Sequence, residues 1–334
     1  MKIVGFGDYL IHFSPIMDER FMQASLMQMT FTGAEANVCM ALGLWGKDTR
    51  FVTKLPTHPL AQKGEMFLRG LSVDTSCIAH GEGRMGTYYL EKGQGVRASV
   101  VIYDRAPSAF TESVPSDYDW DKIFADADTL YLSGITPALS ETLYDCTKAA
   151  LEDAKKRGMK VFFDVNYRPK LGDTKKAGET LMDFAPYITH LISNEEHLKM
   201  LLGIDTEYGE DDRKSRLCDL AGKASEKTGI KNIAITVRRT PSASKAVVYA
   251  AYTDGKDFEL SPEYALDVVD RVGSGDAFSA GLIYAQTSGW SVKDSVAFAS
   301  ASSAMKHMIV SDVNFASVDE IKTVMQGNRY DVKR

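Results

Sequence analysis

Short apolar runs that alternate with longer helix-like segments limit the folds open to this chain of 334 residues more than any other feature. The runs predicted as strands are Lys2–Phe6, Arg50–Thr53, Thr129–Ser133, Lys160–Asp164, His190–Ser193 and Asn232–Val237. Most of them are apolar throughout, as in parallel strands that are covered on both faces. The segments predicted as helices are Ala36–Leu44, Ser140–Lys156, Glu195–Leu202, Arg213–Lys227, Ala277–Thr287 and Val292–His307. Repeated strand–helix units predict an α/β fold, with a mostly parallel sheet flanked by helices.

Residues 81–109 depart from this pattern. Thr87–Glu91, a turn at 93–95 and Ser99–Asp104 alternate exposed and buried positions and predict a β-hairpin. A hairpin inserted into an α/β domain is either a lid over a site or a surface feature, and this stretch alone favours neither. The sequence contains no repeat, low-complexity tract or linker rich in Pro and Gly. We therefore expect a single domain over residues 1–334 with a small β subdomain.

The charge balance and the cysteines narrow the class of protein. Lys and Arg number 39 against 45 Asp and Glu, and the net charge of -6 disfavours a general nucleic-acid binder. A local basic site for an anionic small molecule remains open. No apolar run is long enough to span a membrane, and Asp8 stands where a signal peptide needs an apolar stretch. The four cysteines form no CxxC pair, so we expect reduced thiols and a soluble, cytoplasmic protein.

The residues Asp270-Arg271-Val272-Gly273-Ser274-Gly275-Asp276-Ala277-Phe278 stand directly before a predicted helix rich in Ala and Gly. Glycines around Ser274 allow backbone N–H groups to converge on an anion, and the helix adds its positive N-terminal end. At this position Asp276, with an ordinary pKa near 4, would be ionised at pH 7 and could accept a proton from a hydroxyl. Phosphoryl transfer needs both parts. The alternative is a glycine turn with an Asp helix cap, and GSGD alone favours that alternative.

Competing site motifs are not present. No GxxxxGK[ST] sequence occurs, and the fingerprint GxGxxG fails because Leu10 replaces its third glycine, which argues against a P-loop enzyme and a Rossmann dehydrogenase. The six histidines form no HxxxH or HExxH pattern, so a zinc centre is unsupported. A second cluster lies at Phe31-Thr32-Gly33-Ala34-Glu35-Ala36-Asn37. There Gly33 allows close approach of a polyol and Asn37 can bind its hydroxyls, although Glu35 could simply be a first-turn helix charge.

Together, these two clusters resemble the signature segments of the ribokinase-like (PfkB) carbohydrate kinases, in the same order and with similar separation over essentially the whole chain. Within that family the chain is most similar to the 2-keto-3-deoxygluconate kinases. The segments that carry this likeness are Gly7–Pro15, Phe51–Pro56, Val101–Ala106, Ser133–Ser140 and Asp164–Arg168. Departures are Thr32 in place of a usual glycine, a nucleotide loop at 238–244 without glycine, and Asn194-Glu195-Glu196-His197 in place of a pattern linked with Mg²⁺.

The resemblance implies a β lid formed mainly by residues 9–35 and 81–109, with the site beneath it. It implies ATP with Mg²⁺ as phosphoryl donor, Asp276 as catalytic base, and Gly273, Ser274 and Gly275 as the anion hole. Around the sugar acid it places Gly33, Tyr88, Tyr103, Arg105, Arg168 and Asp312, to which the residue chemistry adds Asn37. It also places Asn166 and Arg168 next to the phosphates, and Asn194, Arg238, Thr240 and Ser242 near the nucleotide, together with Gly273 and Gly275. The residues that hold the metal are left unassigned, and a monovalent cation is left open.

The resemblance therefore predicts phosphorylation of the terminal hydroxyl of 2-keto-3-deoxy-D-gluconate to the 6-phosphate. Arg105 and Arg168 are permanently charged forks that suit a carboxylate or phosphate, which favours an acidic sugar over a neutral one. Their alternatives are a lid salt bridge between Arg105 and Asp104 and a strand-end salt bridge of Arg168. Tyr89 would replace Tyr88 if the strand register slipped by one residue.

Two other functions remain open at this point. The chain could be a fructokinase or another PfkB sugar kinase, or a non-catalytic sugar-acid sensor that keeps the fold. Because exposed lid strands favour pairing between edges, we also expect a homo-oligomer, a dimer or a dimer of dimers, assembled through the lid.

Overall fold

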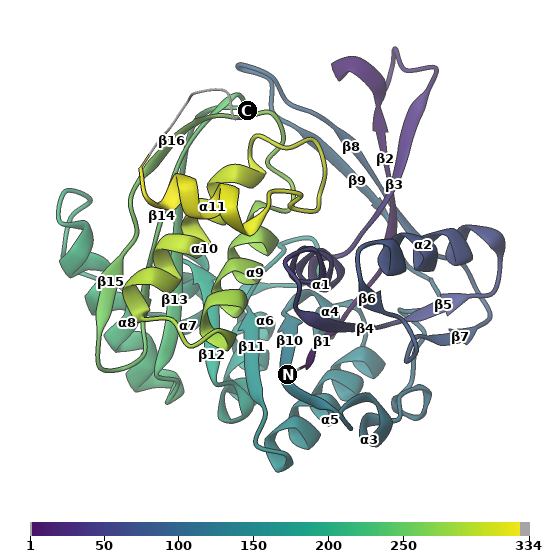
Figure 1. Cartoon of the computed structure of the whole chain (residues 1–334), viewed down its shortest axis with the longest axis horizontal. Coiled ribbons are helices and arrows are strands. Elements are labelled where there is room, and N and C mark those ends of the chain that lie inside the picture. The colour runs from purple at the N-terminus through teal and green to yellow at the C-terminus, as the bar shows by residue number, and fades with distance from the viewer. Residues whose placement is uncertain (1, 328–334) are drawn as a thin grey trace.

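The computed structural model describes residues 2–327, and a ten-stranded sheet forms its centre (Figure 1). Along the sheet the strands follow the order β15 (Phe258–Leu260), β14 (Lys245–Thr253), β13 (Asn232–Ser242), β12 (His190–Asn194), β11 (Lys160–Asp164), β10 (Ala127–Ser133), β1 (Lys2–Phe6), β4 (Asp48–Val52) and β6 (Val73–Asp74), while β16 (Tyr264–Asp267) also pairs with β14. From β13 to β6 all neighbours are parallel, and β14 to β16 add an antiparallel edge. The predicted mostly parallel α/β sheet is confirmed.

Helices cover both faces of this sheet. The helices are α1 (Ala34–Leu44), α2 (Pro59–Gly70), α3 (Trp120–Ile123), α4 (Ile135–Leu139), α5 (Glu141–Lys156), α6 (Thr174–Phe184), α7 (Glu195–Leu202), α8 (Arg213–Thr228), α9 (Ser274–Thr287), α10 (Val292–Lys306) and α11 (Val318–Met325). Side chains of α1, α9, α10 and α11 share one apolar cluster, and those of α5, α6, α7 and α8 share another. None of the helices in residues 2–327 is long and apolar enough to cross a membrane.

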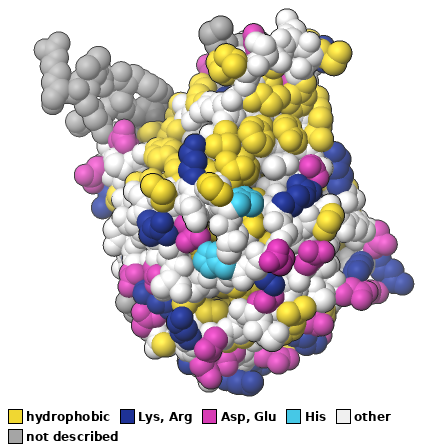
Figure 2. All heavy atoms as spheres, turned by 90° about the vertical axis from the view of Figure 1, so that its right-hand side faces the viewer, with side chains coloured by type: hydrophobic (Ala, Val, Ile, Leu, Met, Phe, Trp, Pro, Cys, Tyr) yellow, Lys and Arg dark blue, Asp and Glu magenta, His cyan; other side chains and the backbone are white. Residues whose placement is uncertain are grey.

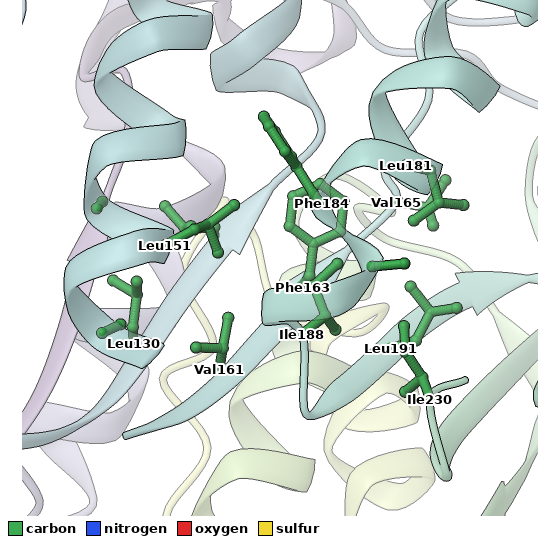
Figure 3. Packing of buried hydrophobic residues seen from close by; sticks show 14 of the residues in the cluster. Leu130, Leu151, Val161, Phe163, Val165, Leu181, Phe184, Ile188, Leu191 and Ile230 are labelled. Atoms are coloured by element: carbon green, nitrogen blue, oxygen red, sulfur yellow. The ribbon is translucent and has the colours of Figure 1, made fainter. Parts of the chain in front are cut away.

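The strands are apolar throughout because neighbouring residues of a strand point to opposite faces of the sheet, and each face is covered by its own apolar cluster. Phe162 of β11 belongs to the cluster with α1 and α9, whereas Phe163 belongs to the cluster with α5 and α6. Figure 3 shows the second cluster, in which Phe163 lies beside Phe184 of α6 with ring centroids 6.2 Å apart. Alternation between two buried faces is the physical reason for a continuous apolar run.

A second sheet stands apart from the main one, at the upper right of Figure 1. It has the order β3 (Met27–Thr32), β2 (Leu10–Pro15), β8 (Gly86–Glu91) and β9 (Val100–Asp104), so two segments far apart in sequence lie side by side. A small third sheet pairs β5 (Lys54–Pro56) with β7 (Ala79–Gly81). Figure 2 shows hydrophobic side chains gathered over the part of the surface where the second sheet lies.

Several predicted boundaries differ from the structure. The strand expected at Asn232–Val237 continues to Ser242, because residues 238 and 239 keep pairing with β14 and the hairpin turns only at 242–245. The helix expected from Ala277 begins at Ser274, so the GSGD residues form its first turn. The helix predicted from Ser140 begins at Glu141, and Ser140 caps it by accepting a hydrogen bond from the Leu143 N–H at 3.2 Å.

Candidate active site

One cavity of about 880 Å³ lies between the carboxyl ends of the parallel strands and the second sheet. In open α/β sheets this edge is where ligands bind. Most of the residues predicted for the site line it, namely Gly33, Asn37, Tyr88, Tyr103, Arg105, Asn166, Arg168, Asn194, Arg238, Gly273, Ser274, Gly275, Asp276 and Asp312. Thr240 and Ser242 are not in its wall, because they lie on the extension of β13 beyond the cavity.

The first turn of α9 forms the floor of the predicted anion hole. Gly273 caps the helix in the left-handed conformation (φ 77°), and a β-carbon added there would lie 1.9 Å from the carbonyl oxygen of Asp312. The Ser274 N–H donates to the carbonyl of Arg271 at 3.3 Å. Within the described residues the amides of Gly275 and Asp276 then remain for an anion at the positive end of the helix. Glycine is required at 273 by both the backbone angle and the close approach.

Asp276 lies in this turn and is held by Asn37 of α1. The Asn37 Nδ2 donates to Asp276 Oδ2 at 2.7 Å, and its Oδ1 accepts from the Thr32 hydroxyl at 3.1 Å. Burial raises the pKa of Asp276 to about 7, the nearby carboxylates of Asp164 and Glu35 add to the increase, and the Asn37 hydrogen bond opposes it. The prediction of an ordinary pKa near 4 is therefore wrong, because the sequence does not show how closely the carboxylates gather.

Asp312 connects the second sheet to the turn before α9. Its carboxylate accepts a hydrogen bond from the Tyr88 hydroxyl and lies 3.2 Å from the Nδ1 of His12. Burial acts to raise the pKa of Asp312, but the contacts with His12 and Tyr88 hold it below the ordinary value. Tyr88 pairs with Tyr103 across the strands, whereas Tyr89 stacks on Phe13. Tyr88 and not Tyr89 lines the cavity, so the predicted register is confirmed.

Arg105 pairs with Asp8 and not with its neighbour Asp104. The guanidinium lies 2.8 Å and 3.1 Å from Asp8 Oδ2 through its Nη2 and Nε atoms. Asp104 instead accepts from Arg84 at 2.5 Å, on the exposed side of the strand. The alternative of a lid salt bridge between Arg105 and Asp104 is therefore wrong. The other oxygen of Asp8 is buried without a hydrogen-bond partner in residues 2–327, which suits a ligand hydroxyl.

Arg168 follows β11 and faces the same cavity. It forms no ion pair within the described part of the chain, so the strand-end salt bridge offered as its alternative is not found. Burial raises the pKa of Asp164 to about 6, and the positive charge of Arg168 opposes this increase. Asn166 adopts a positive φ of 39°, with its N–H donating to Asp164 Oδ1 at 3.0 Å. This turn keeps Arg168 available to an anionic ligand.

Known proteins resemble this chain in sequence and in fold. Residues 1–307 match the pfkB family of carbohydrate kinases. The chain belongs to the pfkB family of carbohydrate kinases. It is 31% identical to a 2-dehydro-3-deoxygalactonokinase of Haloferax volcanii, over 100% of this chain and 99% of the relative. A solved 2-dehydro-3-deoxygluconokinase of Thermotoga maritima is 36% identical, with a TM-score of 0.95 and 98% of each chain covered. A putative ribokinase II of E. coli, solved with ATP and Mg²⁺, shares the fold at 17% identity, with a TM-score of 0.80 over 98% of this chain and 99% of the other.

Some residues predicted to contact the nucleotide have structural partners in this carbohydrate kinase. The side chain of Asn194 caps α7 by accepting from the His197 N–H at 2.7 Å, so it has a structural task besides any ligand. Glu195 pairs with Arg216 at 3.2 Å, and Glu196 lines the cavity. In residues 2–327 no three His, Cys, Asp or Glu side chains group as a metal site. Mg²⁺ that arrives with a nucleotide needs few protein ligands, and the carboxylate of Glu196 in the cavity wall suits that ion.

Sequence reasoning missed two further polar residues of this site. Asp8 stands in a segment that carried the family likeness, but only the tertiary structure shows that it pairs with Arg105. Glu35 does lie in the first turn of α1, but it is buried, and its Oε1 accepts from the Ser133 N–H at 3.0 Å and from the Ser133 hydroxyl at 2.6 Å. Burial raises the pKa of Glu35 to about 7. No pattern in the sequence distinguishes such a carboxylate from an exposed one.

Proposed function

We propose that this chain transfers the γ-phosphoryl group of ATP to the terminal hydroxyl of 2-keto-3-deoxy-D-gluconate and produces the 6-phosphate. The observation that carries this proposal is the gathering of a carboxylate base, a helix N-terminus and two arginines in one cavity. In phosphoryl transfer these groups have separate tasks. The carboxylate accepts a proton, the helix N-terminus binds negative charge on the transferred group, and an arginine binds the anionic end of the acceptor.

Asp276 is the proposed base. Its carboxylate accepts the proton of the sugar hydroxyl while that oxygen attacks, and the Asn37 amide holds the carboxylate in place through the 2.7 Å hydrogen bond. The amides of Gly275 and Asp276, on a turn shaped by Gly273 and Ser274, stabilise negative charge on the transferred group. ATP with Mg²⁺ supplies the phosphoryl group and neutralises part of its charge. Asn166, Arg168 and Arg238 in the cavity wall are the proposed contacts to the phosphates, with Asn194, Thr240 and Ser242 as the remaining nucleotide candidates.

The acidic end of the sugar is assigned to Arg105. Arg105 stands over the Tyr103 ring at 5.3 Å and is fixed by Asp8, so its remaining donors can bind a carboxylate with little loss of side-chain freedom. Gly33, Tyr88 and Asp312 are the proposed contacts to the sugar hydroxyls. The relatives from H. volcanii and T. maritima are both named for 2-dehydro-3-deoxy sugar acids. Because their two named substrates are epimers, 2-keto-3-deoxygalactonate is the second candidate.

We propose that the second sheet acts as the lid of a single kinase domain. The turn between β8 and β9 already reaches across to the β13–β14 hairpin, where Gly95 accepts from the Ala243 N–H at 2.8 Å and donates to the Ser244 hydroxyl at 2.8 Å. Lys92 of the same turn lies 3.4 Å from Asp270. These contacts enclose the cavity and exclude water that would otherwise compete with the sugar hydroxyl for the phosphoryl group.

We also propose a homo-oligomer formed through the lid, in the cytoplasm, with a sugar acid and ATP as the small-molecule partners. The support is the apolar outer surface of the second sheet, where Ile102 is 50% exposed and Val100 42%. Strands β3 and β9 form the edges of this sheet, and an edge strand can pair with a strand of a second copy.

The test is ADP release with Mg-ATP, comparing 2-keto-3-deoxygluconate, 2-keto-3-deoxygalactonate, gluconate, fructose and ribose at equal concentrations. We expect the two keto-deoxy acids to be turned over in strong preference to the others. Preference for fructose or ribose would keep the kinase and remove the carboxylate site. Binding of a sugar acid with no turnover of any sugar would instead identify a sensor.

A further inference from the structure

Lys306, the last residue of α10, is completely buried, with 0% of its surface exposed. Lysine is rarely buried unless a carboxylate pairs with it, and Lys306 forms no ion pair within residues 2–327. Its ammonium instead donates to two backbone carbonyls, those of Asp270 at 3.3 Å and Ile309 at 3.0 Å. Burying an ammonium without a paired carboxylate costs free energy, so packing alone does not explain why a lysine stands at this position.

The two carbonyls belong to the segments that build the floor of the active site. Asp270 precedes the turn with Gly273, and Ile309 precedes the loop with Asp312. These segments meet where Gly273 approaches the Asp312 carbonyl too closely for a β-carbon. The backbone N–H of Asp270 also donates to the carbonyl of His307 at 3.0 Å, next to Lys306. Through these two hydrogen bonds Lys306 connects the turn before α9 to the loop that carries Asp312, on the side away from the cavity.

The ammonium also neutralises buried negative charge at this point. Asp270 and Asp312 are 5% and 2% exposed. Burial lowers the pKa of Lys306, and the attraction of its ammonium to these two carboxylates opposes this decrease. Lys92 on the lid is the other cation near Asp270, at 3.4 Å. Two carbonyl oxygens, those of Asp270 and Ile309, lie around this positive charge at the end of a helix, and carbonyl oxygens in such a place can also hold a monovalent metal cation.

We infer that Lys306 is a positioning residue whose ammonium takes the place of a bound monovalent cation behind the anion hole. The kinase then needs no added K⁺ or Na⁺. This inference rests on the proposed kinase activity and answers the question of a monovalent cation that the sequence leaves open.

The first experiment measures kcat of the wild-type protein in KCl and in choline chloride at the same ionic strength, about 0.1 M. We expect a change in kcat of less than about twofold, because the positive charge is already present. Activation by K⁺ of about tenfold or more would overturn the inference without any variant.

The second experiment compares Lys306→Ala, which leaves space for an ion, with Lys306→Met, which fills it. In choline chloride we expect both to lose kcat by about tenfold to a hundredfold, with a smaller change in KM for the sugar acid. K⁺ or NH₄⁺ should restore kcat of Lys306→Ala and not of Lys306→Met. Full activity of Lys306→Ala in choline chloride, or equal lack of rescue in both variants, would contradict the inference.

Thermal unfolding provides a readout that does not depend on turnover. Lys306→Ala should melt about 2 °C or more higher in KCl than in choline chloride, while the wild-type protein should not. Lys2→Met is the matched control, since Lys2 is also buried but pairs with Asp126 at 2.7 Å at the far end of β1. We expect Lys2→Met to lower the melting temperature without any dependence of kcat on K⁺. If no sugar is phosphorylated, the proposed function fails, and the melting comparison still decides whether Lys306 occupies a cation position.

Discussion

At the scale of single residues, Asp276 is the side chain on which the proposed chemistry depends. Asp276→Asn keeps the size of the side chain but removes the proton acceptor. We expect kcat to fall by about 10²–10⁴-fold, the usual contribution of a general base. Binding of the sugar acid, measured by calorimetry, should change little because the arginines remain. Turnover near that of the wild-type protein would assign the base to another residue.

The raised pKa of Asp276 determines the pH dependence. The base acts only when deprotonated, and its pKa of about 7 means that this form is lost as the pH falls below 7. We therefore expect kcat/KM, measured with both substrates well below saturation, to rise with pH and to level off above a midpoint near 7. Asn37→Leu removes the hydrogen bond that opposes the shift, so its midpoint should move to higher pH. A wild-type midpoint near 4 would show that the carboxylate is not enclosed in the working enzyme.

Arg105 tests whether the acceptor is acidic. Arg105→Gln removes the proposed fork for the carboxylate, and we expect KM for 2-keto-3-deoxygluconate to rise by about 10- to 100-fold. The matched control is Arg84→Gln, which removes an arginine from the same lid but breaks only the exposed pair with Asp104. Steady-state kinetics of the two variants should differ clearly. If the two variants had the same KM for 2-keto-3-deoxygluconate, Arg105 would not bind the carboxylate of the sugar.

At the scale of an element, the beginning of α9 depends on one glycine. Gly273→Ala would force a β-carbon against the Asp312 carbonyl and strain a left-handed backbone, so we expect a loss of stability of about 1–3 kcal/mol. Gly275→Ala is the control in the stability measurement and should change stability little. No atom lies within 4 Å of a β-carbon added at this position, and the φ angle of Gly275 is not positive. Urea unfolding measures both. Equal stabilities would mean that the turn relaxes away from Asp312.

At the scale of the whole molecule, the second sheet offers its apolar outer face and the free edge of β9 to a second copy. Ile102→Lys introduces a charge on that edge strand, and we expect the mass measured by light scattering to fall to that of one chain. Val96→Lys makes the same change at the fully exposed hairpin turn and should leave the assembly intact. A wild-type protein that is already a single chain would exclude assembly through the lid.

Local patterns were sufficient for much of the fold. Strands β1 and β11 and helix α7 begin and end where the sequence predicts, because continuous apolar runs, a Ser or Asn cap and a terminal glycine act within a few residues. The extension of β13 was missed because Arg238–Ser242 looks like a polar loop. Only its pairing with β14 makes it a strand, and that pairing depends on a partner outside the segment.

The sequence by itself determined the α/β architecture, the family and a set of site residues, most of which lie in the cavity wall, because those properties lie in short motifs and in their order. The tertiary structure alone decided which partners these residues take. It encloses Asp276 near the carboxylates of Asp164 and Glu35, so that burial and these charges raise its pKa, pairs Arg105 with Asp8, and buries Lys306 behind the first turn of α9. Charge interactions and desolvation depend on distance through space, and the residues concerned are separated by up to hundreds of positions in the chain.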